Sequence, residues 1–131
     1  MRKQARYLIG AIILSATVLA SSESNAVGAF ALGRNDDGGW WYGLSWDHNS
    51  RRSAREDAMR RCSRRGPRCK VETTFWNKCF AVAFQTRGNG YGWATRDSKR
   101  EAEQVAMEGC EKHGRDCEIK ESICDEVAVD D

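Results

Sequence analysis

Residues 50–69 read SRRSAREDAMRRCSRRGPRC, and residues 98–117 read SKREAEQVAMEGCEKHGRDC, the same pattern displaced by 48 positions. Serine, alanine, methionine, glycine and cysteine recur at equivalent places in the two stretches. Upstream, Tyr42-Gly43 recurs as Tyr91-Gly92 with a slip of one residue. Two units of this length are too few for a solenoid and have to close on each other to bury a core. The sequence therefore predicts one domain built from a duplicated unit.

Each repeated stretch predicts an α-helix that lies close to a sheet. Ser50 and Ser98 stand at the N-cap position, and Glu101 completes a capping box with Ser98. Small residues recur on one helical face, which lets a helix approach a sheet closely. They are Ala54, Ala58 and Cys62 in the first stretch and Ala102, Ala106 and Cys110 in the second. Gly66 and Gly114 follow the helices, where a left-handed residue commonly ends a helix.

Short apolar stretches on both sides of each helix predict strands. The first strands are expected near 30–32 and 80–84, the return strands at 40–46 and 91–95, and the third strands at 69–76 and 117–124. Glycine-rich turns separate the first two strands of each unit. The sequence thus predicts an α+β fold, a duplicated β-β-α-β unit in two layers, with a mostly antiparallel sheet and two helices. The two repeats cover about residues 28–76 and 79–124.

The first 26 residues are typical of a secretory signal peptide. Arg2, Lys3 and Arg6 precede an apolar run at 8–20, and Ser24-Asn25-Ala26 is a small-x-small cleavage site. The run of 13 residues is shorter than the roughly 20 that a spanning helix needs, although a signal anchor is an alternative. We expect cleavage after Ala26 and export to the periplasm or the extracellular space. A single disulfide-stapled domain at 27–124 and an acidic C-terminal tail at 125–131 would follow, with no transmembrane segment in the mature chain.

All six cysteines lie after the expected cleavage site, and an even count in a small exported chain predicts a disulfide framework. In each unit, two cysteines flank the glycine turn between helix and strand, so they can approach to bonding distance. The other two have no repeat partners and remain for each other. The predicted disulfides are Cys62–Cys69, Cys110–Cys117 and Cys79–Cys124. Zinc sites favour cysteines two to four residues apart, whereas six residues separate these pairs, so we expect no metal.

The helices of pattern Ser-x3-Ala-x3-Ala, each leading into Cys-x6-Cys, occur together with aromatic–glycine strands such as Tyr91-Gly92-Trp93. This combination resembles the secreted bacterial family catalogued as domain of unknown function 4189, and the resemblance covers about residues 28–124. It implies an exported, cysteine-paired domain without an agreed biochemical activity, and it supplies no catalytic residues. The chain departs from the family pattern in its arginine-dense first helix and its acidic tail.

Charge is distributed unequally along the chain. Residues 27–131 hold 18 basic and 18 acidic side chains, so the expected mature chain is formally neutral. Residues 27–78 hold 11 basic and 6 acidic side chains, whereas residues 79–131 hold 7 and 12. A neutral chain in an exported compartment argues against nucleic acid as a partner. The oppositely charged halves would allow a homodimer, either two-fold, which we favour, or head-to-tail.

Arginine crowds the first helix and its exit. The candidate partner-binding residues there are Arg51, Arg52, Arg55, Arg60, Arg61, Arg64 and Arg65. Those near the C-terminal end also face the negative end of the helix dipole. One interpretation is a solvated helix face, and the other is a site for an acidic protein or an acidic envelope polymer. Trp41 is a further candidate if it forms an exposed platform rather than part of the core.

Signatures of catalysis are weak. His48 stands beside Asp47, with Ser45 and Ser50 nearby, but adjacent residues on a strand point to opposite faces. The chain has no Gly-x-Ser-x-Gly motif. We therefore expect no enzyme, no catalytic residues and no cofactor. The favoured function is an exported non-enzymatic binding module that engages an acidic partner through the arginine-rich helix. The alternatives are an inhibitor or immunity-type protein that blocks an envelope hydrolase with a loop such as 40–46 or 87–91, and a small hydrolase that uses His48.

Overall fold

The computed structural model describes residues 26–125. Its elements are β1 (Val27–Arg34), β2 (Trp40–His48), α1 (Arg51–Ser63), β3 (Lys70–Trp76), β4 (Cys79–Gln85), β5 (Tyr91–Arg96), α2 (Lys99–Glu111) and β6 (Cys117–Cys124). The signal peptide predicted at 1–26 lies outside the described residues except for Ala26, and the acidic tail does so except for Asp125. Within 26–125, neither helix combines the length and the apolar character that a membrane crossing requires.

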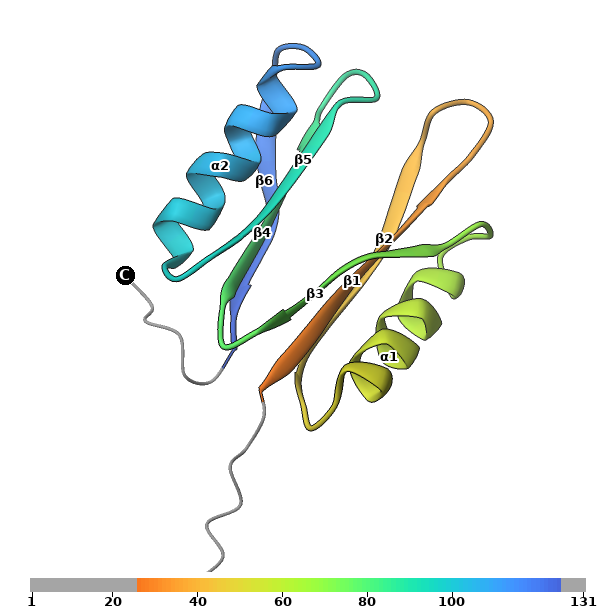
Figure 1. The fold of residues 1–131 in the computed structure, drawn as a ribbon. Helices are drawn as coiled ribbons and strands as arrows, with labels where there is room; N and C mark the ends of the chain where they lie inside the picture. The colour runs from red at the N-terminus through yellow and green to blue at the C-terminus, as the bar shows by residue number, and fades with distance from the viewer. Residues whose placement is uncertain (1–25, 126–131) are drawn as a thin grey trace, which may run out of the picture.

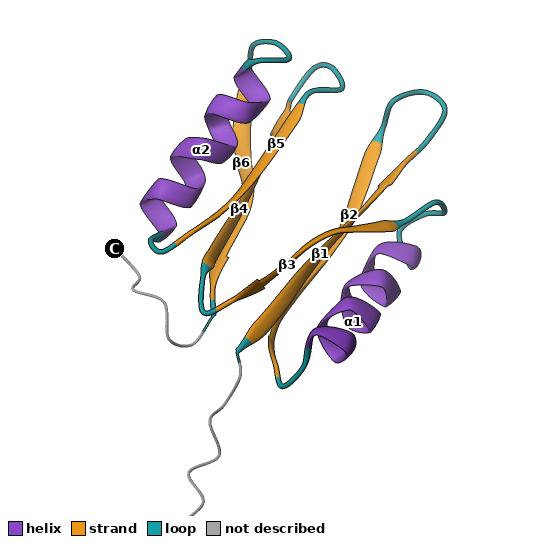
Figure 2. Ribbon diagram, viewed as in Figure 1, coloured by secondary structure: helices purple, strands orange, loops and turns teal. Residues whose placement is uncertain are grey.

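The predicted duplication of a β-β-α-β unit is confirmed. The first unit, Val27–Trp76, forms an antiparallel sheet of order β2-β1-β3, and the second unit, Cys79–Cys124, forms one of order β5-β4-β6. Each helix covers the outer face of its own sheet, and the two sheets face each other between the helices (Figure 1). Each unit therefore has two layers and the molecule has four (Figure 2). The strands form two three-stranded sheets rather than the single sheet expected, because the units meet through their aromatic sheet faces and not edge to edge.

Alternation along the central strands explains this layering. In β1, Phe30 faces the other sheet, and its neighbours Ala29 and Ala31 face α1. In β4, Phe80 likewise faces inward and Ala81 faces α2. The ring centroids of Phe30 and Phe80 lie 4.8 Å apart at the centre of the molecule. The large side chains thus form one aromatic core between the sheets, and the small ones leave room for a helix on each outer face.

Two glycines let the helices approach the return strands. Gly43 of β2 lies against the α1 backbone at Ala58, and Gly92 of β5 lies against the α2 backbone at Ala106. A Cβ atom at either glycine would overlap the helix backbone. The repeated Tyr-Gly pair therefore marks the place where the helix and sheet of each unit are closest.

Both helices begin at the predicted N-cap serines, but within residues 26–125 the Glu101 side chain forms no hydrogen bond back to Ser98, so only half of the predicted capping box is present. The Ser50 hydroxyl accepts a hydrogen bond from the Ser53 N–H at 3.1 Å, and the Ser98 hydroxyl accepts one from the Glu101 N–H at 3.2 Å. Each bond satisfies an N–H group that the first turn of a helix leaves without a partner. The two N-caps fix equivalent starts for α1 and α2.

The turn after each helix differs in part from the prediction. Gly114 has a positive φ of 158°, but Gly66 does not have a positive φ. A Cβ at Gly66 would meet the Trp41 ring, so this glycine is required for close packing and not for its conformation. The left-handed positions common to both units are Arg68 and Asp116, with φ values of 62° and 61°. Both directly precede the second cysteine of their unit.

The three disulfides join the pairs expected from the sequence. Cys62–Cys69 and Cys110–Cys117 each fasten the end of a helix to the following strand of its own unit. Cys79–Cys124 joins β4 to β6, at residues that face each other in the strand ladder. Such a framework is typical of proteins from the periplasm or the extracellular space.

Candidate functional site

The seven candidate arginines are all exposed, but they form two groups. The N-terminal group of α1 is Arg51, Arg52 and Arg55. The C-terminal group is Arg60, Arg61, Arg64 and Arg65. In the N-terminal group, the Arg52 Nε atom lies 3.1 Å from the Glu56 carboxylate, in an exposed pair. The C-terminal group meets side chains of β2 and β6 in one cavity, whereas Arg51 of the N-terminal group lines a separate cavity with Val27 and Trp76.

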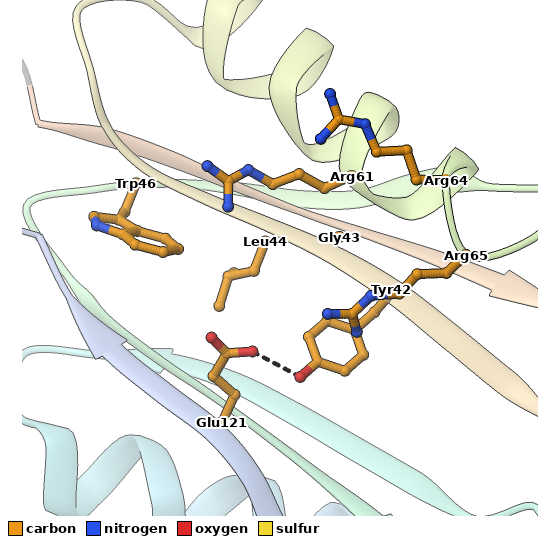
Figure 3. Close-up of a pocket in the computed structure, with 8 residues that line it drawn as sticks. All are labelled: Tyr42, Gly43, Leu44, Trp46, Arg61, Arg64, Arg65 and Glu121. Atoms are coloured by element: carbon orange, nitrogen blue, oxygen red, sulfur yellow. Dashed lines mark hydrogen bonds between the residues drawn. The ribbon is translucent and has the colours of Figure 1, made fainter.

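Three arginines of the C-terminal group line a cavity of about 230 Å³, which we call the arginine pocket (Figure 3). Its lining residues are Tyr42, Gly43, Leu44, Trp46, Arg61, Arg64, Arg65 and Glu121. The arginines come from α1 and its C-terminal end, the two aromatic residues from β2, and the glutamate from β6. The arginine pocket therefore lies where the first unit meets the second.

Tyr42 and Glu121 join the two units across this pocket. The Tyr42 hydroxyl donates a hydrogen bond to the Glu121 carboxylate at 2.6 Å. Burial of the phenol and this bond to a carboxylate raise the pKa of Tyr42 to about 12. Tyr42 therefore remains a hydrogen-bond donor throughout the neutral pH range.

The arginines lie over the aromatic rings of β2. The Arg65 guanidinium carbon is 4.9 Å from the Tyr42 ring centroid, and that of Arg61 is 5.3 Å from the Trp46 ring centroid. Such cation–π contacts hold a guanidinium in place and leave N–H groups at its edge for a ligand. Among residues 26–125, Arg64 forms no ion pair. The pocket thus offers positioned donors for an anionic group.

Asp57, a residue that the sequence analysis did not single out, holds two of the arginines. Its buried carboxylate accepts hydrogen bonds from Arg60 Nη2 at 2.8 Å and from Arg61 Nε at 3.2 Å. Burial opposes ionisation of Asp57, but the hydrogen bonds from His48 and the two arginines outweigh it, and its pKa is lowered. Asp57 therefore stays charged and fixes Arg61 beside the pocket. The spacing to Arg60 and Arg61 is the helical i+3 and i+4 spacing, which the sequence does show.

His48 contacts a serine and an acid other than its sequence neighbours. Its Nδ1 atom lies 2.7 Å from the Ser53 hydroxyl, and its Nε2 atom lies 3.0 Å from Asp57. Ser45 is buried and donates to the Ala54 carbonyl at 2.6 Å. The row Ser53–His48–Asp57 connects the end of β2 to α1. A serine triad also needs donors that stabilise an oxyanion, which these three side chains do not supply, and the absence of enzymatic activity stays a prediction.

Trp41 lies on the face of β2 opposite to the arginine pocket. It packs with the cluster beneath α1, where its ring contacts Gly33 and Gly66, and it is partly buried. The exposed aromatic residue of β2 is Trp46, with 39% of its surface accessible. Trp46, near the end of β2 and outside the inter-sheet core, is therefore the tryptophan whose ring lies beneath an arginine of the pocket.

The two glycine-rich turns lie at the same end of the molecule (Figure 1). Trp40 Nε1 donates a hydrogen bond to the Asn89 carbonyl at 2.8 Å, and Gly38 lies against the Asn89 side chain. A second cavity, of about 560 Å³, runs from both turns to Tyr42 and Phe84. Of the two segments predicted as a blocking loop, 87–91 forms most of the turn between β4 and β5, whereas 40–46 lies in strand β2 and is joined to that turn at Trp40.

Comparison with known proteins yields one match. No match was found among curated proteins or among solved structures. The family model described as "Domain of unknown function (DUF4189)" matches residues 27–124, which span both units and all three disulfides. The chain belongs to this family.

Proposed function

We propose that this chain is a non-enzymatic binding module that engages an acidic partner protein through the arginine pocket. The grouping of Arg61, Arg64 and Arg65 with Trp46 and Tyr42 in one cavity carries this proposal. Arginine, tryptophan and tyrosine are the residue types that contribute most of the binding energy in protein interfaces. The guanidinium fork also matches the geometry of a carboxylate.

The size of the arginine pocket supports an anchoring side chain rather than a whole small molecule. Its volume of about 230 Å³ is below the roughly 300–1,000 Å³ that small-molecule sites have. A repetitive acidic envelope polymer would be matched by an uninterrupted basic surface. Here Glu121 interrupts the basic lining of the pocket, so a partner protein is the better match.

We also propose that the chain is exported with removal of residues 1–26 and works in the periplasm or outside the cell. The three disulfides support an oxidising compartment. Export would be tested by amino-terminal sequencing of the protein from a periplasmic fraction, which should begin at Val27. A homodimer through the oppositely charged halves stays a further prediction.

The binding proposal is tested by charge reversal. Arg64→Glu combined with Arg65→Glu should weaken binding of a fluorescent decapeptide of glutamate by about tenfold or more at low salt, because attraction becomes repulsion. The matched control is Arg51→Glu combined with Arg55→Glu, which changes the net charge equally at the other end of α1. Fluorescence anisotropy gives both dissociation constants. Equal losses in the two variants would show that only net charge matters and would contradict the proposal.

The contact between the glycine-rich turns favours a second candidate function. Joined by the bond from Trp40 to Asn89, they form one projecting edge that would fit the cleft of an envelope hydrolase. The test is inhibition of cell-wall hydrolysis by a purified peptidoglycan hydrolase. Asn89→Arg should abolish the inhibition, whereas the Arg64 and Arg65 reversal should leave it unchanged.

For the small-hydrolase alternative, His48→Ala should abolish any turnover.

A further inference from the structure

Glu121 is a carboxylate within a pocket whose other charged side chains are three arginines. We propose that Glu121 determines the charge pattern of the partner. The pocket takes an acidic side chain that has a cationic or hydrogen-bond-donating group beside it, such as a glutamate next to a lysine, in preference to an isolated anion. This inference rests on the proposed binding function and names the kind of partner surface that the same site selects.

The positions of the charged groups support this inference. Arg61 and Arg65 extend toward the rings of β2 from α1 and its C-terminal end, and Arg64 points away from Glu121, which enters from β6 on the opposite side (Figure 3). Among residues 26–125, Glu121 forms no ion pair with the arginines, and its hydrogen bond to Tyr42 engages only the Oε2 atom. A ligand therefore meets hydrogen-bond donors on one wall and a free acceptor atom, Oε1, on the other.

The Tyr42 side chain keeps Glu121 in this position. Tyr42 is only 8% exposed, and its ring packs against Phe30 and Phe84, so the hydroxyl cannot follow a glutamate that turns toward solvent. Movement of Glu121 out of the pocket would break the 2.6 Å bond between them. The acceptor is thus a fixed part of the site rather than a surface charge that a ligand can push aside.

Coulomb interactions then discriminate between ligands. An isolated anion in the pocket is attracted by the arginines and repelled by Glu121 at the same time. A cation or donor placed beside the anion, on the Glu121 side, adds an attraction to Glu121 that offsets this repulsion. Specific interfaces commonly combine attractive contacts with one repulsive element that rejects wrong partners, and Glu121 is that element here.

The experiment compares two fluorescent decapeptides on the full oxidised chain. Both contain five glutamates, which alternate with lysine in one peptide and with glutamine in the other. The measured quantity is the dissociation constant of the glutamine peptide divided by that of the lysine peptide, so a larger ratio means a stronger preference for the lysine peptide. Glu121→Gln should reduce the relative preference for the lysine peptide by about tenfold, because the acceptor loses its charge. Glu118→Gln is the matched control: it removes one exposed charge from the same strand, outside the arginine pocket, and should change the ratio by less than about twofold.

The outcomes separate this inference from the function on which it rests. Equal effects of Glu121→Gln and Glu118→Gln would overturn the inference, because they would reflect net charge alone. Binding of both peptides that depends on Arg64 and Arg65 but keeps the same ratio in Glu121→Gln would retain the proposed function and overturn the role of Glu121. A wild-type chain that binds neither peptide would overturn both. Tyr42→Phe keeps the ring and frees Glu121, so it should reduce the ratio in the same direction, by about threefold.

Discussion

The two units use the same residues where helix meets sheet and different residues where the helix end meets solvent. Ala58 and Cys62 of α1 have identical equivalents at Ala106 and Cys110 of α2, and all four are buried. Helix and strand backbones are in contact there, so a larger side chain does not fit. Around the helix ends no such restriction applies. The comparison teaches that the closest helix–sheet contacts allow little variation, and that the exposed guanidinium groups of the candidate site lie away from them.

A buried position that differs between the two helices is Asp57, whose equivalent is Val105. Asp57 positions Arg60 and Arg61, whereas Val105 has no polar group to position a neighbour. In the second unit, Tyr91 and His113, the equivalents of Tyr42 and Arg65, line a different cavity of about 270 Å³ with residues of β4 and the β4–β5 turn. Two equivalent residues are thus used in cavities of different chemistry.

The largest predicted effect concerns Cys79–Cys124, a disulfide that only the second unit has. Its sequence separation of 45 residues gives a stabilisation of about 4 kcal/mol in the chain-entropy model, against about 2.4 kcal/mol for each disulfide with a separation of 7. Replacement of both cysteines by alanine should lower the free energy of unfolding by these amounts in urea titrations. The variants that lack Cys62–Cys69 or Cys110–Cys117 serve as controls for each other. If their free energies of unfolding fell by clearly different amounts, the equivalence of the two scaffolds would be contradicted.

The next effect concerns Asp125, which occupies the position equivalent to Asn77. The Asn77 N–H bonds to the Ala26 carbonyl and the Asp125 N–H to the Lys78 carbonyl, both at 3.1 Å. Burial of the Asp125 carboxyl, only partly offset by the hydrogen bond from the Asp47 N–H, raises its pKa to about 6. Because this value exceeds the 3.8 of an ordinary aspartate, ionisation opposes folding.

Asp125→Asn, which gives the second unit the residue of the first, should therefore stabilise the protein at neutral pH. The wild-type chain loses stability as the pH rises from about 4 to about 6, and the full loss is present above that range. We expect a gain of up to about 3 kcal/mol at pH 7 and little change at pH 4. Urea unfolding at both pH values measures this. A gain of equal size at both would contradict burial of the charge as its cause.

A smaller effect is expected from Asp57→Val, which gives α1 the residue of α2. His48, Arg60 and Arg61 lose a shared acceptor, so the free energy of unfolding should fall by about 1–3 kcal/mol at pH 7. Since the pKa of Asp57 is lowered on folding, this contribution is present above its ordinary value of 3.8 and is lost as the pH falls below it. Glu56→Val, which removes only the exposed pair with Arg52, should change stability by less than about 0.5 kcal/mol.

The smallest effect is a change in titration. Glu121→Gln should lower the pKa of Tyr42 from about 12 toward 10, because an uncharged acceptor stabilises the phenol less. Burial persists in the variant, so the pKa should remain above 10. Ultraviolet absorbance against pH measures it, with Tyr91 as the internal reference. An unchanged titration would mean that the bond between Tyr42 and Glu121 does not form in solution.

Local features of this fold can be predicted from sequence, and features that depend on stacking of the units cannot. The N-caps at Ser50 and Ser98 and the small-residue faces follow from spacing within one helix, and the short disulfides follow from spacing across one turn. The arginine pocket depends on Tyr42 meeting Glu121, 79 residues away, across two sheets that pack face to face. Tyr42 belongs to the first unit and Glu121 to the second, so patterns within either unit do not predict that contact. Asp57 has a readable helical spacing to Arg60 and Arg61, but its burial is a property of the folded helix.

The face-to-face packing of two similar sheets has a consequence for how the site can change by mutation. If each unit were a separate subunit made from one gene, every substitution would occur in both subunits, and both equivalent positions would carry it. Here both units belong to one polypeptide chain, joined at Asn77 and Lys78, so equivalent positions are encoded separately and can differ. Arg61 can therefore face Glu121 while their equivalents are Gly109 and Thr73. Covalent fusion is what permits two near-copies of one fold to form a site with unlike walls.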